Sequence, residues 1–177
     1  MKMIIKIIVV IIAIVSVCMV IAMFSKSKYT LTREIIINRS VADVFDYVRY
    51  LKNQPEYNKW LLLDPNTKIG YKGQPDGSPG AILTFESKNS KAGKGEFEIK
   101  RVTAGERLDF EIRFLAFTAN GSIAAKALSP NSTRLTWIYN SGMNWPVNFM
   151  LLFMDMDKII GNDIAESLRN IKRRLES

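Results

Sequence analysis

The sequence predicts an α+β protein in which a curved antiparallel sheet wraps around one long C-terminal helix, with one membrane-spanning helix in front of this domain. Three observations lead to this fold class. A run of 18 uncharged residues stands near the N-terminus, at 7–24. Between residues 68 and 139, apolar and polar side chains alternate in short segments, as in a sheet with one covered face. From residue 149 onward, apolar residues recur at three- and four-residue steps, as in an amphipathic helix.

Two shortages in the composition narrow the chemistry open to this chain. The 177 residues contain no histidine, which removes Ser-His-Asp and Cys-His arrangements and histidine-ligated zinc sites. Cys18 is the only cysteine, so neither an intrachain disulfide nor a cysteine-rich metal site can form. We therefore expect no metal and no cofactor. Any catalysis has to come from Asp, Glu, Lys, Arg, Tyr, Ser or Thr.

The net charge of +8 arises from 25 Lys and Arg against 17 Asp and Glu. An ordinary solvated surface accounts for it, and attraction to an anionic membrane surface is the alternative. We do not expect nucleic-acid binding, because no predicted helix carries a basic stripe interleaved with aromatic residues. The single dense basic cluster is Lys172-Arg173-Arg174, near the C-terminus.

The run from Ile7 to Phe24 predicts an uncleaved, single-pass membrane anchor. With Met3 to Ile5 in front, the stretch reaches 22 residues and is interrupted only by Lys6. About 20 helical residues cross roughly 30 Å of hydrocarbon, whereas the apolar part of a signal peptide has about 7–15 residues before a cleavage site that is missing here. We expect an anchor with a short joint at 1–27 and a globular domain at 28–177. The very short basic N-terminal tail favours a domain on the non-cytoplasmic side.

The domain is predicted to begin with a strand and two short helices. Leu31 to Ile37 is rich in β-branched residues, which favours a strand. Ser40 followed three residues later by Asp43 is typical of a helix N-terminus, and apolar residues then follow at helical spacing. Pro55 to Trp60 predicts a second short helix or a turn, before Asp64-Pro65-Asn66 interrupts the chain.

Six alternating segments then predict an antiparallel sheet. Their apolar residues share one phase, and clusters of Gly, Pro, Asn, Asp and Ser separate most of them as turns. A sheet of this kind is wet on one face and covered on the other. The predicted strands are 68–71, 81–87, 96–100, 108–114, 123–127 and 135–139.

The final segment predicts one long helix that covers the apolar face of the sheet. Pro146 suits its first turn, and apolar residues trace one face from Phe149 to the C-terminus. Nearly thirty residues make roughly 40 Å of helix, enough to cross a whole sheet. Gly161 interrupts the pattern, which indicates either close packing or a bend.

The order of the elements and several short motifs resemble those of the SRPBCC polyketide cyclase/dehydrase-like proteins. Their fold is the helix-grip fold, also called START or Bet v 1-like. The resemblance covers about residues 30 to 175 and implies a cavity between the sheet and the long helix. Its motifs are Trp60 with Asp64-Pro65, Gly73-x-x-Asp76-Gly77-x-x-Gly80-Ala81, Asp157-Lys158-x-x-Gly161-x-Asp163 and Leu168-x-x-Ile171-Lys172.

The side chains predicted to line this cavity come from the apolar phase of the strands and from the helix. Aromatic stripes at strand spacing also occur in plain cores, so the resemblance is what favours a cavity. A fully packed interior without a pocket at Phe110, Trp137 or Tyr139 would argue against ligand binding and against catalysis. The predicted ligand-binding residues are Phe85, Phe97, Phe110, Ile112, Phe114, Trp137, Tyr139, Phe153, Met156, Ile160 and Asp163.

Two of these residues are candidates for acid–base chemistry. Asp163 lies near the apolar stripe of the helix, and burial of a carboxyl group raises its pKa. Tyr139, on the opposite sheet face, could orient or protonate a carbonyl group. The alternative for Asp163 is a structural carboxylate that accepts hydrogen bonds from a loop or pairs with an arginine.

The function expected from the sequence is a membrane-anchored module that binds a hydrophobic small molecule or a lipid. A cyclase or dehydratase that uses Asp163 and Tyr139 is the first alternative. An interaction module of the Hsp90-activator type, which uses its surface, is the second. A hollow interior with few polar groups favours the binder, whereas an isolated acid and a tyrosine at reaction distance favour the enzyme.

Overall fold

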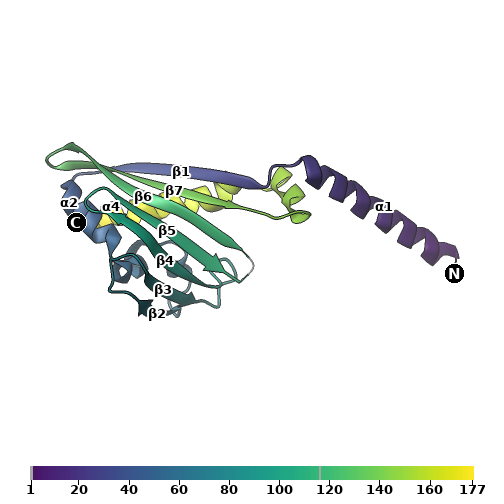
Figure 1. The fold of residues 1–177 in the computed structure, drawn as a ribbon, viewed down its shortest axis with the longest axis horizontal. Helices are drawn as coiled ribbons and strands as arrows, with labels where there is room; N and C mark the ends of the chain where they lie inside the picture. Colours follow the sequence, from purple (N-terminus) through teal and green to yellow (C-terminus); the bar gives the residue numbers. More distant parts are fainter. Residues whose placement is uncertain (1, 116) are drawn as a thin grey trace.

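The computed structural model describes residues 2–115 and 117–177. One antiparallel sheet of seven strands has the order β1-β7-β6-β5-β4-β3-β2. Helices α2 and α4 lie on one face of this sheet, and α1 projects away from the domain (Figure 1). The helices are α1 Lys2–Phe24, α2 Val41–Arg49, η1 Leu51–Asn53, α3 Gln54–Tyr57, η2 Leu61–Leu63, η3 Val147–Leu152, η4 Asp157–Gly161 and α4 Asn162–Glu176. The strands are β1 Lys28–Ile37, β2 Lys68–Gly73, β3 Ala81–Glu86, β4 Lys94–Thr103, β5 Arg107–Phe114, β6 Thr118–Ser129 and β7 Ser132–Gly142.

The predicted sheet is confirmed, and its first and last strands are neighbours. β1 pairs with β7 over its whole length, from Lys28 opposite Gly142 to Ile37 opposite Thr133. All six strands expected after β1 are present, and several extend beyond the predicted bounds. The alternation of β5 reproduces the predicted phase, since Leu108, Phe110 and Ile112 are all buried.

The first helix of the domain begins where the sequence predicts. The Ser40 hydroxyl accepts a hydrogen bond from the backbone N–H of Asp43 at 3.2 Å, which satisfies one of the free amides of the first turn. α2 then buries Val44, Phe45 and Val48 against the sheet. Each fully buried aliphatic or aromatic side chain of this kind stabilises the fold by about 1.5–3 kcal/mol.

The prediction of one continuous helix from residue 149 to the C-terminus is wrong for the first half of this segment. Val147–Leu152 forms the separate 3₁₀ helix η3, and a π-helical turn, η4, precedes α4. Close packing explains why residue 161 is a glycine, because a Cβ atom there would lie 2.3 Å from Nη2 of Arg33. The same arginine pairs with Asp157 at 2.8 Å, so β1 fixes the point at which the helix begins.

The remaining helix closes the core over β1 and β7. Ile164, Leu168 and Ile171 of α4 are fully buried, at the helical spacing expected of an inward stripe. They join the same hydrophobic cluster as Leu135 and Trp137 of β7. Half the predicted length therefore suffices, because α4 covers this face only over β1 and β7, and the segment 51–63 covers the same face over β3, β4 and β5.

The N-terminal helix is separate from this core. Among the described residues α1 is the one helix long and apolar enough to cross a bilayer. Nearly all its side chains are exposed, and Ala22 is its one buried residue. A helix with an apolar surface all round is suited to a lipid environment.

Candidate ligand-binding site

The structure places the predicted strand residues on one covered face of the sheet. Phe97 lies directly opposite Ile112, and Phe110 lies opposite Gly121, which in turn lies opposite Tyr139. Because side chains on a strand alternate between faces, this register brings the aromatic residues of four strands together. The buried set is Phe85, Phe97, Phe110, Ile112, Trp137 and Tyr139, and Phe114 is half-buried beside it.

Much of this face is packed ring against ring. Phe97 stacks on Phe110 with ring centroids 4.7 Å apart, and Phe110 meets Trp137 edge-on at 6.1 Å. The Phe110 ring passes over Gly121, where a Cβ atom would lie 2.8 Å from its Cζ atom. This part of the interior is therefore filled core, and each such aromatic pair adds about 0.5–1.5 kcal/mol beyond its buried area.

A small, partly open cavity lies on the same face, over β3, β4 and β5 and under the short helices of segment 51–63. Its volume is about 20 Å³, which is room for about one water molecule. Four of the predicted residues line it. Phe110, Trp137 and Tyr139 do not, so the pocket expected at these three residues is not found, and any ligand site in this interior has to lie away from them. Its lining is Gln54, Asn58, Trp60, Leu61, Leu83, Phe85, Phe97, Ile112 and Phe114.

Two buried amide side chains supply the polar part of this cavity. Gln54 is fully buried, and its Oε1 atom accepts a hydrogen bond from Nδ2 of Asn58 at 2.7 Å. The Nε2 donor of Gln54 has no hydrogen-bond partner among the residues that the structure describes. A buried donor without a partner costs about 1–3 kcal/mol, so this group favours a bound water or ligand oxygen.

Several other buried polar atoms lack a hydrogen-bond partner among the described residues, and two of them belong to neighbouring aromatic side chains. Nε1 of Trp137 and the hydroxyl of Tyr57 are buried without a hydrogen bond, and their rings meet at 6.5 Å. Neither lines the cavity.

Both acid–base candidates lie near Trp60. The Trp60 ring lies 6.1 Å from that of Tyr139, and the Trp60 side chain lies beside Asp163. Burial raises the pKa of Asp163 above its ordinary value, and the neighbouring Trp60 side chain opposes this shift. Burial also raises the pKa of Tyr139. Because neither of them lines the cavity, their arrangement suits the positioning of Trp60 better than joint catalysis.

The three apolar residues predicted to line the cavity from the C-terminal helix, Phe153, Met156 and Ile160, differ in how far they are buried. Phe153 lies outside the core with 80% of its surface exposed, because the chain around it is not part of α4. Met156 is half-buried. Ile160 packs against the core from η4, and none of the three lines the cavity.

Sequence reasoning missed five of the lining residues. Gln54, Asn58, Trp60 and Leu61 belong to the segment between α2 and β2, where the sequence predicted only a short helix or turn. Leu83 shares the strand phase already recognised. The available signal was the pair of amide residues four positions apart next to Trp60, a spacing that places both on one face of a helix turn.

Two aspartates of the sequence motifs hold this segment in place. The carboxylate of Asp76 accepts hydrogen bonds from the backbone N–H groups of Leu51 at 2.7 Å and Lys52 at 3.1 Å. Asp64 accepts from the backbone N–H of Lys88 at 3.0 Å, which ties the end of η2 to the β3–β4 turn. These motif residues therefore shape the cavity wall rather than line it.

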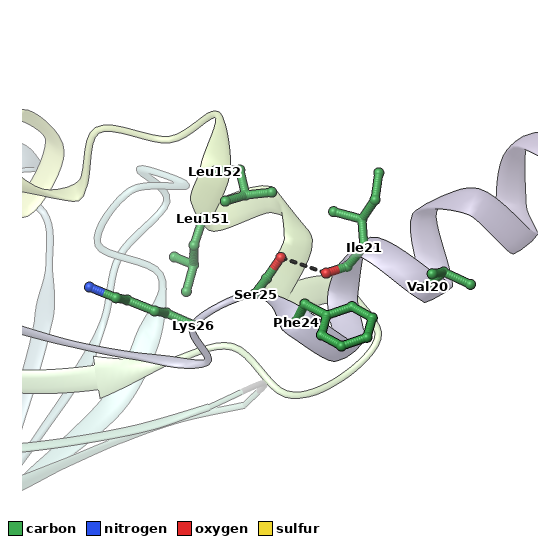
Figure 2. A pocket seen from close by; sticks show the side chains of 7 residues that line it. All are labelled: Val20, Ile21, Phe24, Ser25, Lys26, Leu151 and Leu152. Atoms are coloured by element: carbon green, nitrogen blue, oxygen red, sulfur yellow. Dashed lines mark hydrogen bonds between the residues drawn. The ribbon is translucent and has the colours of Figure 1, made fainter.

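A second, open cleft lies between α1 and η3 (Figure 2). It is lined mainly by apolar side chains and has a volume of about 560 Å³. No residue expected from the sequence as a ligand contact belongs to it. Its lining is Val20, Ile21, Phe24, Ser25, Lys26, Leu151 and Leu152.

The sequence pattern of one protein family, described as polyketide cyclase / dehydrase and lipid transport, matches residues 28–176. The chain belongs to this family. The matched residues run from β1 to the end of α4, so the resemblance inferred from the motifs is confirmed. No curated protein matches the sequence.

Solved structures with similar folds confirm the helix-grip fold expected for this family. The Aha1 dimer from Colwellia psychrerythraea has a TM-score of 0.60 at 13% identity, covering 84% of this chain and 96% of that chain. Truncated norcoclaurine synthase from Thalictrum flavum has a TM-score of 0.61 at 13% identity, with coverages of 86% and 97%. The di-domain ARO/CYC StfQ of steffimycin biosynthesis has a TM-score of 0.63 at 9% identity, with coverages of 85% and 52%. At these identities the likeness establishes the fold alone.

Proposed function

We propose that this chain is a membrane-anchored module that binds a hydrophobic small molecule or a lipid beneath segment 51–63. The observation that carries the proposal is the Nε2 donor of Gln54, which is buried, unpartnered and part of an aromatic-lined cavity. Such a site recognises an apolar body that carries one hydrogen-bond acceptor, such as a carbonyl or hydroxyl oxygen. Membership of a ligand-handling family and the apolar α1 helix support this assignment.

The cavity has to widen before it accepts such a ligand. Ligand pockets measure about 300–1,000 Å³, far above the 20 Å³ of this closed form. Its outer wall consists of α3 and η2, with four and three residues. Short elements open at a lower free energy than a long packed helix such as α4. Outward movement of Trp60 with η2 is therefore the proposed route of entry.

The proposed module is divided into an anchor at 1–27 and a ligand-binding domain at 28–177, with the domain on the non-cytoplasmic side.

A cyclase or dehydratase is the weaker assignment, because Asp163 and Tyr139 do not share a cavity. A surface-interaction module of the Hsp90-activator type receives no support beyond the fold, since Aha1 shares only 13% identity with this chain.

The test is native mass spectrometry of the full-length chain purified from its own cells, followed by extraction and identification of any bound molecule. Wild-type protein should carry a hydrophobic molecule. Gln54→Met keeps the shape of the side chain but removes the amide, and should lower occupancy about tenfold, as expected for one lost buried hydrogen bond.

Ser122→Ala is the matched control. It also removes a buried, unpartnered polar atom, but from β6 outside the cavity, and should leave occupancy unchanged. Circular dichroism checks that both variants fold. Wild-type protein that carries no bound molecule, or equal occupancy in both variants, would contradict the proposal.

A further inference from the structure

Apolar side chains are exposed together just after β7. We call this the anchor-end patch. Phe153 exposes 80% of its surface, and Leu152 exposes 58%. Clustered exposure of large apolar residues marks a surface that contacts another apolar phase. The patch consists of Trp145, Val147, Met150, Leu152 and Phe153.

This patch is tied to the end of α1 by side-chain hydrogen bonds. Nδ2 of Asn148 donates to the carbonyl of Ala22 at 2.8 Å and to that of Ser25 at 3.2 Å. Nε1 of Trp145 donates to the carbonyl of Met19 at 3.4 Å. The Ala22 carbonyl belongs to the last turn of α1, where carbonyl groups have no partner within the helix. η3 is thereby held beside α1, as Figure 1 shows.

The position of these bonds along α1 sets the depth of the patch. Met19 precedes the last helical residue, Phe24, by five residues, which is roughly 7 Å along the helix axis. Segments that lie in a membrane interface sit about 5–10 Å into the boundary between headgroups and acyl chains. Tryptophan is enriched at this boundary, because its ring is apolar and its N–H is polar. With α1 in the membrane, Trp145 would therefore lie at the boundary between headgroups and acyl chains.

A second apolar protrusion lies at the same end of the sheet. Asn120 of β6 lies opposite Asn140, which lies opposite Thr30 of β1, so the β5–β6 turn is at the end where α1 joins. Leu115 and Phe117 beside this turn are exposed, Leu115 completely. Phe117 stacks on Phe114, which lines the small cavity, at 4.6 Å.

The cleft between α1 and η3 is suited to an acyl chain. Val20, Ile21 and Leu152 line it, and Lys26 stands where the helix ends (Figure 2). Lysine at the end of a membrane helix extends its amine to the headgroups. An apolar cleft with a basic residue at its rim matches a phospholipid, whose chains are apolar and whose phosphate is anionic.

We propose that the anchor-end patch is a second membrane contact, in which η3 lies in the lipid interface and acyl chains occupy the cleft beside α1. The inference rests on the proposed anchoring by α1. This second contact would orient the domain so that the β5–β6 turn and the end of the sheet that holds the cavity point toward the bilayer. The proposed ligand would then enter from the lipid phase rather than from bulk water.

The test measures the depth of one residue of the patch in the full-length chain. Cys18→Ser removes the only native thiol, and Phe153→Cys then carries a fluorescent NBD label. The chain is reconstituted into phosphatidylcholine and phosphatidylglycerol vesicles with nitroxide-labelled acyl chains, which quench NBD on contact. The matched control is Leu128→Cys in the same background, an exposed apolar position at the β6–β7 hairpin, at the opposite end of the sheet.

The label at 153 should be quenched at least about twofold more than the label at 128, since only the former reaches the acyl region. Equal quenching at the two positions, in a chain that vesicles retain through alkaline carbonate, overturns the second contact and leaves the anchor standing. A chain that carbonate extracts overturns the anchor and this inference together. Neither result depends on a bound ligand in the cavity.

Discussion

Burial gives the carboxyl group of Asp163 a pKa above that of the same group in the unfolded chain. The folded chain then binds this proton more tightly, so the group contributes most stability below the unfolded pKa of about 3.8. That contribution declines as the pH rises through the raised pKa and is constant above it. A carboxylate at the edge of the core is thus a small cost to the fold at neutral pH.

Asp163→Asn removes this titration and keeps a side chain of the same size, with an oxygen atom, beside Trp60. We expect the stability of the variant relative to wild type to increase from pH 3 to pH 7. The change should stay below about 1 kcal/mol, because the group is only partly buried and solvent screens it. Urea unfolding at both pH values measures it. If the stability of the variant relative to wild type instead decreased from pH 3 to pH 7, the raised pKa of Asp163 would be refuted.

The same substitution separates three roles of Asp163. Ligand occupancy that falls while the fold is intact indicates a binding contact. Loss of a turnover with binding retained indicates catalysis. An effect on stability alone indicates the positioning of Trp60, which is the outcome we expect from the geometry.

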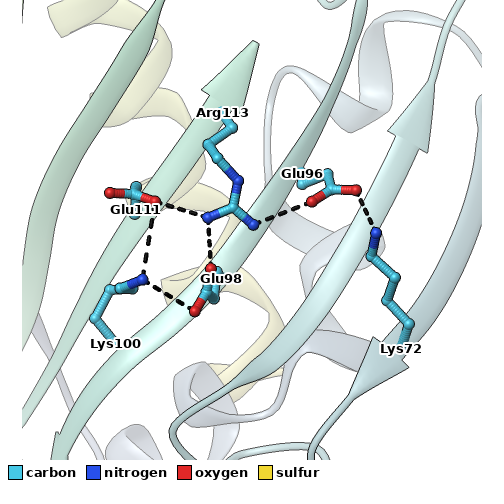
Figure 3. Close-up of polar contacts among 6 residues, drawn as sticks. All are labelled: Lys72, Glu96, Glu98, Lys100, Glu111 and Arg113. Carbon is cyan, nitrogen blue, oxygen red and sulfur yellow. Dashed lines mark hydrogen bonds and ion pairs between the residues drawn. The ribbon is translucent and has the colours of Figure 1, made fainter.

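At the scale of elements, the open face of the sheet is held by a charge network across β2, β4 and β5 (Figure 3). Glu98 and Glu111 lie directly opposite each other, an arrangement of like charges that destabilises a sheet. Arg113 pairs with both and with Glu96. The hydrogen bond from Arg113 lowers the pKa of Glu98, and those from Lys72 and Arg113 lower the pKa of Glu96.

Arg113→Gln should therefore destabilise the domain by about 1 kcal/mol at neutral pH and low salt. Because the folded pKa values of Glu96 and Glu98 are lowered, the stabilisation is present above the unfolded pKa of 4.5 and is lost as the pH falls through the folded values. The difference from wild type should shrink at pH 3 and in high salt. Thermal unfolding across pH and salt measures it.

Arg107→Gln is the control for this network. Arg107, the first residue of β5, pairs with Asp109 alone among the described residues. Loss of this one exposed ion pair should change the free energy of unfolding by less than about 0.5 kcal/mol. Equal losses for the two variants, or a loss at Arg113 that salt does not reduce, would show that packing rather than charge holds this face.

At the scale of the whole molecule, α4 closes the domain and α1 does not. Removal of Phe149–Ser177 should abolish cooperative folding, because the apolar sheet face would be exposed at roughly 25 cal/mol per Å². Removal of residues 1–27 should leave a folded domain at 28–177, since the core lies beyond α1. Differential scanning calorimetry compares the two truncations. A cooperative transition without the C-terminal segment would contradict the assigned role of α4.

The sequence by itself determined the anchor segment as a candidate, the seven strands, the cap of α2 and the face on which the aromatic residues lie. These features depend on local periodicity and capping, which neighbouring residues encode. The motifs also led to the family, because turn glycines and loop aspartates have fixed spacing. The choice of Phe85, Phe97, Ile112 and Phe114 as cavity-lining residues followed from the same strand phase.

Only the tertiary structure decided where the C-terminal helix begins and which part of the interior is hollow. The apolar period from Phe149 continues through Phe153, but Arg33 of β1 and the end of α1 assign these residues to separate elements. Gln54 reaches the cavity from a segment with weak local signals. The contacts of Arg33 with Asp157 and of Ala22 with Asn148 join residues more than a hundred positions apart, and no local pattern records them. An apolar side chain is equally compatible with a core and a lipid interface, so its place depends on what the fold puts beside it.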